Sequence, residues 1–75
     1  FDLDETASIS VDLYDFAMER VKVICDKRSF PAGQNWEVYW DGSDLQGVRV
    51  ATGVYFYRFR KNDDSPVWGK IMVVK

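Results

Sequence analysis

Histidine is absent from this 75-residue sequence, and cysteine occurs only once, at Cys25. The first absence removes the usual general base, the Ser/His/Asp triad and most transition-metal sites. The second excludes an internal disulfide framework, and with no histidine or helix start nearby Cys25 has no evident route to a reactive thiolate. We therefore expect a chain that is not an enzyme and that carries no cofactor.

Long apolar runs and blocks of like charge are also missing. No apolar stretch approaches the roughly 18 residues that a membrane span needs, so we expect none. The net charge of -2 gives no basic footprint for phosphates, which argues against a nucleic-acid partner. Arg58, Arg60 and Lys61 lie beside aromatic residues, as in single-strand stacking surfaces, but we interpret them as the polar face of a strand.

Aromatic side chains, in contrast, are abundant. They make up 16% of the chain, and the hydrophobic fraction is 47%. Each buried ring removes about 150–250 Å² from water, which is dense stabilisation for a small domain. This composition is typical of a folded globular protein, and 75 residues predict a single domain with a thin core.

The dominant hydrophobic period is two, which indicates strands rather than helices. The expected strands cover residues 1–3, 9–13, 21–25, 36–40, 54–61 and 67–74. Residues 26–34 are expected to be a connection, and residues 14–22 to contain at most one helical turn. Six or seven short strands with turn signals about every 8–12 residues predict an all-β fold, an antiparallel β-sandwich.

Alternation also predicts which side chains face the core. Arg58 and Arg60 share the polar face of their strand. The residues expected to point inward are Val21, Val23 and Cys25 in one strand and Tyr55, Tyr57 and Phe59 in another.

Three aromatic residues in the segment 36–40 raise the alternative of a sugar-stacking platform, as in carbohydrate-binding modules. Trp36 and Trp40 share a face with Val38, however, so core packing is the better interpretation. Tyr39 and Trp68 are then the aromatic side chains that we expect to be partly exposed to solvent.

The most informative stretch runs from Trp40 to Gly47 and is followed by a β-prone aromatic segment at 53–58. Asp41, Ser43 and Asp44 place several oxygens on one loop, which raises the alternative of a calcium site. An EF-hand-type loop that starts at Asp41 would need Gly at its sixth position, where this chain has Gln46, so we expect no metal. Turn chemistry explains the stretch better, because Gly takes positive φ freely and Asp bonds to the backbone two residues on. The residues assigned to this turn motif are Trp40, Asp41, Gly42, Asp44 and Gly47.

At this point the chain resembles a known family. The elements that carry the resemblance are, in order, Tyr14-Asp15, Val21-Lys22-Val23, Pro31-Ala32-Gly33, Trp40-Asp41-Gly42, Asp44, Gly47, Val50, Gly53-Val54-Tyr55-Phe56-Tyr57-Arg58 and Lys70-Ile71-Met72-Val73-Val74-Lys75. This ordered set is similar to the Ig-like domain named after the flagellar hook-capping protein FlgD, and to the related C-terminal sorting domains of type IX secretion. The likeness covers nearly the whole chain, and the full Trp-Asp-Gly-x-Asp-x-x-Gly loop is closer to the hook-capping type. One departure is Met18 or Glu19, where these families usually carry Gly.

The resemblance implies a small Ig-like β-sandwich without chemistry of its own, in a secreted or cell-surface bacterial protein. In sorting domains, the secretion machinery reads parts that match Gly53, Val54 and Tyr55 and the terminal strand with Lys70 and Lys75. In hook-capping proteins the module supports assembly of a surface structure. The expected partners are therefore secretion machinery, or neighbouring domains or subunits.

Because the chain opens at Phe1 without an initiator Met, we expect it to be a piece of a longer polypeptide, and the resemblance implies that this piece is C-terminal. Two alternatives to export sorting or surface attachment remain open. The first is a structural spacer or assembly module, and the second is a carbohydrate-binding module.

Overall fold

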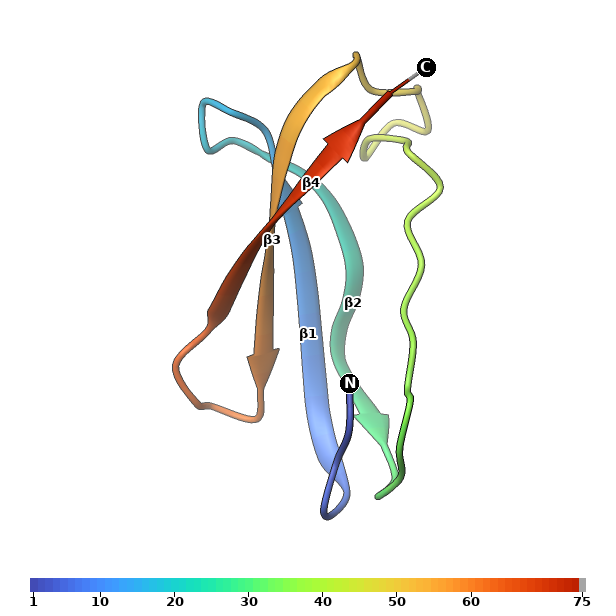
Figure 1. The fold of residues 1–75 in the computed structure, drawn as a ribbon, viewed down its shortest axis with the longest axis vertical. Coiled ribbons are helices and arrows are strands. Elements are labelled where there is room, and N and C mark those ends of the chain that lie inside the picture. The colour runs from blue at the N-terminus through green and yellow to red at the C-terminus, as the bar shows by residue number, and fades with distance from the viewer. Residues whose placement is uncertain (75) are drawn as a thin grey trace.

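The computed structural model describes residues 1–74, and within them the chain forms one four-stranded antiparallel sheet and no helix. The strands are β1 (Ala7–Tyr14), β2 (Arg20–Phe30), β3 (Gly53–Lys61) and β4 (Val67–Val73) (Figure 1). They lie in the order β2-β1-β3-β4, so β1 and β3 are central and β2 and β4 form the edges. The all-β prediction is confirmed.

The core lies on one face of the sheet, here called the inner face. Along β1 the apolar side chains of Ala7, Ile9, Val11 and Leu13 alternate with polar ones and are all buried. Ile9 and Leu13 are almost fully enclosed, at 0% and 1% exposure. This is the side-chain period of two that the sequence predicts for a strand with one buried face. The opposite, outer face carries the intervening residues.

Strand β2 is longer and less regular than predicted. The expected connection at 26–34 is wrong in its first part, because β2 continues to Phe30. Val11 pairs with Cys25 but Asp12 pairs with Val23, so Ile24 is an extra residue of the kind that forms a β-bulge. The bulge brings both Ile24 and Cys25 to the core and leaves Val23 opposite Asp12, on the outer face. The prediction that Val23 shares an inward face with Cys25 is therefore wrong.

Strands β3 and β4 place their aromatic residues as predicted. Tyr55 is buried, and Tyr57 and Phe59 pack against the core cluster. Tyr57 pairs directly with Gly69 of β4, and a Cβ atom on Gly69 would lie only 2.1 Å from the tyrosine ring. Because Gly69 has no side chain, the Tyr57 ring can occupy the space directly above its backbone.

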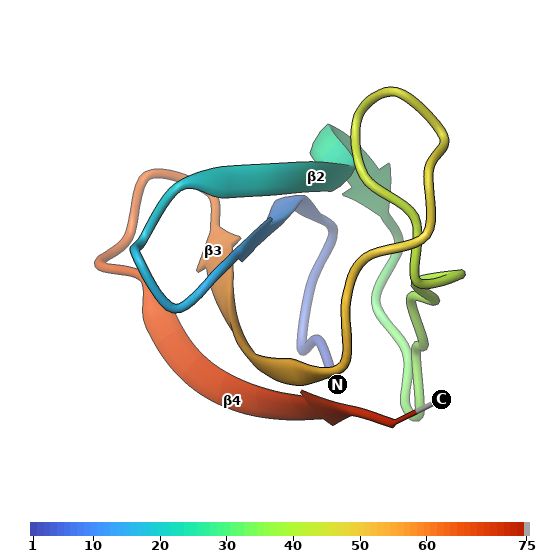
Figure 2. The same ribbon diagram turned by 90° about the horizontal axis from the view of Figure 1, so that it is seen from above.

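Segments outside the four strands cover the inner face. The N-terminal residues pair with a segment far along the chain: Leu3 and Gly33 exchange backbone hydrogen bonds of 2.8 and 3.0 Å. Phe1 N donates to Trp36 O at 2.7 Å, and Trp36 N donates to Phe1 O at 2.9 Å. Seen from above, the sheet curves so that β2 and β4 lie on opposite sides of the N-terminal segment (Figure 2). The strand expected at 1–3 is thus a short bridge in this covering layer.

Residues 36–40 belong to the same layer but do not form the strand that their alternation predicts. Trp36, Val38 and Trp40 do pack against the core, while Glu37 and Tyr39 face solvent. The alternation therefore predicted correctly which side chains of the segment are buried, although the segment has no hydrogen-bonded neighbour strand.

The turn between β1 and β2 contains a strained residue. Asp15 and Glu19 close it through a 2.9 Å hydrogen bond from Asp15 N to Glu19 O, and Met18 adopts a φ of 63°. Such a left-handed conformation is unfavourable for residues with a side chain.

Candidate functional site

The loop after Trp40 uses its carboxylates to fix its own backbone. Asp41 Oδ1 accepts hydrogen bonds from Ser43 N at 3.0 Å and from Ser43 Oγ at 2.5 Å. Asp44 Oδ1 accepts two more, from the backbone N–H groups of Gln46 and Val48, both at 2.9 Å. The two hydrogen bonds from Ser43, with the nearby charge of Lys22, hold the pKa of Asp41 below its ordinary value. These carboxylate oxygens act as turn acceptors.

The same loop is tied to the sheet through strand β2. Lys22 Nζ donates to Ser43 Oγ and to the Asp44 carbonyl, both at 3.2 Å. The Trp40 indole N–H donates to the Ser43 carbonyl at 2.8 Å. Among residues 1–74, no group of three or more His, Cys, Asp or Glu side chains is placed to hold a metal ion. The loop is therefore a fixed connection that orients Trp40 toward the core.

The two halves of the sequence motif meet in space. The ring of Trp40 contacts the ring of Tyr55 edge to face, with centroids 5.5 Å apart. The Tyr55 hydroxyl donates to the Ala51 carbonyl at 2.7 Å. The positive φ angles of Gly42 and Gly47, each 80°, shape the loop that makes this approach possible.

The residues proposed for partner contact lie on neighbouring strands. Gly53, Val54 and Tyr55 pair with Val73, Met72 and Ile71 of β4, respectively. Lys70 of β4 is exposed and pairs with Phe56. Lys75 lies outside the described residues.

Edge strand β4 has an apolar, accessible surface. Three hydrophobic residues of β4 are highly exposed, namely Val67 at 60%, Trp68 at 45% and Met72 at 63%. The residue that follows the strand, Val74, is 77% exposed. Edge strands of soluble proteins usually carry charge or cover instead. The edge of the sheet at β4 is thus a candidate surface for a partner.

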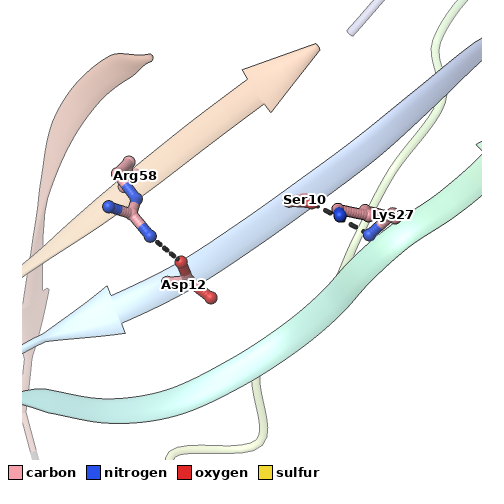
Figure 3. Close-up of polar contacts among 4 residues, drawn as sticks. All are labelled: Ser10, Asp12, Lys27 and Arg58. Atoms are coloured by element: carbon pink, nitrogen blue, oxygen red, sulfur yellow. Dashed lines mark hydrogen bonds and ion pairs between the residues drawn. The ribbon is translucent and has the colours of Figure 1, made fainter. Parts of the chain in front are cut away.

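A second candidate surface lies on the outer face and was not predicted from the sequence. Arg58 of β3 forms an ion pair of 2.5 Å with Asp12 of β1, directly across the ladder (Figure 3). The Arg58 guanidinium also lies over the rings of Tyr14, at 5.4 Å, and Trp68, at 5.9 Å. These two rings contact each other at 5.3 Å. We call Asp12, Tyr14, Arg58 and Trp68 the outer cluster.

The cluster could have been found only from the strand register. Asp12 and Arg58 are 46 positions apart, and nothing in the local sequence links them. Asp12 is 6% exposed, although the alternation of β1 marks it only as a residue of the polar face.

The other aromatic candidates fall into two groups. Trp36 packs edge to face on Phe30 and its indole N–H donates to the Pro31 carbonyl, so this ring belongs to the core layer together with Trp40. Tyr39 is 78% exposed, and its hydroxyl donates to Glu37. Tyr39 and Trp68 are exposed as predicted and lie in different parts of the structure, but Phe16, which was not predicted to be exposed, is more exposed than Trp68, at 78%.

Cys25 is buried among the core residues of β1 and β2. Burial raises the pKa of its thiol, which is the environment of an unreactive cysteine.

No helix in the described part of the chain is long and apolar enough to cross a membrane. Comparison with known proteins gives no relative: no family model, curated protein or solved structure matches the chain.

Proposed function

We propose that this chain is a non-catalytic C-terminal accessory domain of a bacterial extracellular protein, and that it serves export sorting or cell-surface attachment. The observation that carries the proposal is the edge strand β4, whose exposed side chains at Val67, Trp68 and Met72 are apolar. An edge strand offers backbone N–H and C=O groups to an added strand, and apolar side chains add affinity.

The proposed architecture is a small Ig-like antiparallel β-sandwich of the FlgD type, with six or seven short strands. The covering layer supports it, because residues 1–3 pair with 33–36 and residues 36–40 bury alternate side chains against the sheet. In this reading these segments are rudimentary strands of a second sheet. The contact between Trp40 and Tyr55 gives the two halves of the family-like motif a shared structural purpose.

The first experiment tests sufficiency. Residues 1–75, fused to the C-terminus of an exported reporter in a type IX-competent host, should bring the reporter to the cell surface or the medium. A reporter that stays in the periplasm would overturn the sorting role.

The second experiment tests strand β4 without deleting it, because removal of residues 70–75 would also disturb folding. Met72→Glu places a carboxylate on the exposed apolar edge strand and should strongly reduce export. Tyr39→Glu is the matched control, since Tyr39 is also highly exposed but lies outside the sheet. Circular dichroism of both purified variants checks folding, and equal export by the two would contradict a role for β4.

A structural spacer or assembly module is the second candidate. It predicts that both variants leave export unchanged and that the parent protein forms a repetitive or filamentous structure.

A further inference from the structure

The outer face of the sheet contains a polar depression of about 300 Å³ beside the outer cluster. Four cationic side chains line it, namely Arg20 and Lys27 from β2 and Arg58 and Arg60 from β3. Three acidic side chains line it as well, so the depression has a positive excess although the whole chain has a net charge of -2. Its charge therefore differs in sign from that of the chain, which favours an anionic ligand at this place.

The walls of the depression are held in place by the sheet. Asp12 is buried at its base and pairs with Arg58, which fixes the guanidinium between the depression and the aromatic rings. On the β2 side, Lys27 N donates to Ser10 Oγ at 2.9 Å, and Lys27 adopts a φ of 52° (Figure 3). The Arg58 side chain and the backbone at Lys27 are therefore fixed, and sites built on strands are more exact in geometry than sites on loops.

The outer cluster supplies a stacking surface next to the depression. Trp68 is 45% exposed, and its ring contacts that of Tyr14. Arg58 belongs to both parts, because it lines the depression and lies over both rings. Aromatic rings with one apolar face and a polar surround suit ligands that are apolar on one side and polar at the edges.

We propose that this surface binds an acidic oligosaccharide, a chain of sugar rings that carries carboxylate groups. A sugar ring would stack its C–H face on Trp68, and the carboxylates of the following rings of the same chain would lie in the depression near Arg60 and Lys27. The site goes beyond the export role proposed above, because binding of a purified glycan requires no secretion partner.

The acidic residues of the depression decide between a sugar and a nucleic acid. Asp26 and Asp63 line it without an ion pair among the described residues, and Asp12 lies at its base. These carboxylates repel a ligand carboxylate and a phosphate alike, so repulsion does not separate the two ligands. They also accept hydrogen bonds from hydroxyl groups, which every ring of an oligosaccharide carries and the interior of a DNA strand lacks. Aromatic rings and cations without such carboxylates would favour single-stranded nucleic acid instead.

Binding can be measured on the purified 75-residue chain by calorimetry and by backbone amide shifts in NMR spectra. A hexamer of galacturonic acid should bind, with shifts at β1, β3 and Trp68, and cellohexaose should bind at least about tenfold more weakly. Raising NaCl from about 0.05 M to about 0.5 M should weaken the acidic ligand because exposed charges are screened.

Substitutions separate stacking from charge. Trp68→Ala should weaken binding about tenfold or more, as for an aromatic contact at the centre of an interface. Arg60→Gln and Lys27→Gln should each weaken it about two- to fivefold, the range of exposed ion pairs. Both side chains are exposed, so these two variants keep the test valid if Trp68→Ala does not fold.

Two controls lie away from the depression. Tyr39→Ala removes another exposed ring, and Arg49→Gln removes another exposed cation, and neither should change the affinity. The proposal is overturned if the galacturonate hexamer does not bind, if cellohexaose binds equally well, if an oligo-dT strand binds more tightly, or if the controls weaken binding as much as the site variants.

Discussion

Strand β1 is hydrogen-bonded to β3 on one side and to β2 on the other, and the two sides are built differently. The pairing with β3 is unbroken, from Ile9 opposite Lys61 to Tyr14 opposite Phe56. The pairing with β2 shifts register three times within a similar length. Two of the non-glycine residues with positive φ, Met18 and Lys27, lie in the turn to β2 or within that strand.

The difference shows what each kind of pairing provides. An unbroken ladder places side chains directly opposite one another, and this produces the Asp12–Arg58 pair. In a bulged ladder the side chains no longer lie directly opposite one another, but the bulge bends the strand and changes which side chains face inward. This is how Ile24 and Cys25, adjacent in sequence, both reach the core.

The largest effect should come from the core that both sides share. Leu13→Ala should lower the free energy of unfolding by about 2–5 kcal/mol, because it leaves a cavity beneath both ladders. Urea denaturation followed by tryptophan fluorescence measures it. Met72→Ala, at an exposed position of β4, is the control and should change stability by less than about 0.5 kcal/mol. Similar losses for the two variants would contradict the assignment of the inner face as the core.

The next prediction compares the two sides directly. Asp12→Asn should lower the free energy of unfolding by about 1–3 kcal/mol, since it leaves Arg58 without its partner. The loss is smaller than for a fully buried pair because the Arg58 side chain is 30% exposed and water screens its charge. Ser10→Ala removes the acceptor of Lys27 N on the β2 side and should cost about 0.5–1 kcal/mol. A greater loss for Ser10→Ala would mean that the bulged side, rather than the regular one, depends more on its polar contacts.

A stabilising change is expected in the turn that leads into the irregular side. Met18→Gly should raise stability by about 0.5–1 kcal/mol, because glycine relieves the strain at φ 63° more than it adds entropy to the unfolded chain. The midpoint of thermal unfolding measures the gain. Ala17→Gly, at the preceding residue without positive φ, should instead lower the midpoint. A lower midpoint for Met18→Gly would contradict the left-handed conformation.

The smallest effect concerns the loop that supports β2 through Lys22. The folded pKa of Asp41 lies below its ordinary value of 3.8, so its contribution to stability is complete above that value and is lost as the pH falls through the folded pKa. Ser43→Ala removes the hydrogen bond from the Ser43 hydroxyl, which is the largest cause of the lowered pKa, and should raise the Asp41 pKa toward 3.8. Carboxyl NMR titration follows it, with Ser65→Ala as a control that leaves Asp41 unchanged. An unchanged Asp41 pKa in Ser43→Ala would contradict the leading role of the Ser43 hydroxyl and leave the Ser43 backbone N–H and the charge of Lys22 as the causes.

The sequence predicted the regular side of the sheet better than the irregular side, for a physical reason. In β1, and in β3 from Tyr57 to Arg60, apolar and polar residues alternate because one face of the sheet packs against the core and the other does not. In β2 the exposed run from Asp26 to Ser29 has no alternation, and the bulges break the period around Val23. Residues 36–40 show the opposite: their sequence alternates but they form no strand, because alternate side chains can be buried without a neighbouring strand.

The candidate surfaces also differ in how far the sequence predicts them, because one depends on local residues and the other on strand register. The turn at Asp41–Gly47 could be predicted, since Asp and Gly act locally. The outer cluster could not, because Asp12, Arg58 and Trp68 come from three strands and meet only through register. Exposure of Trp68 was predictable from alternation, but its neighbours were not.

The order in which the strands follow one another also bears on how fast the chain reaches this structure. Residues 15–19 join β1 to β2 and residues 62–66 join β3 to β4, so each hairpin closes a short loop and should form within about 1–10 μs. The β1–β3 ladder joins distant parts of the chain and must wait for closure of the long connection at residues 31–52. We therefore expect β1 and β3, the two central strands of the finished sheet, to be the last to find each other.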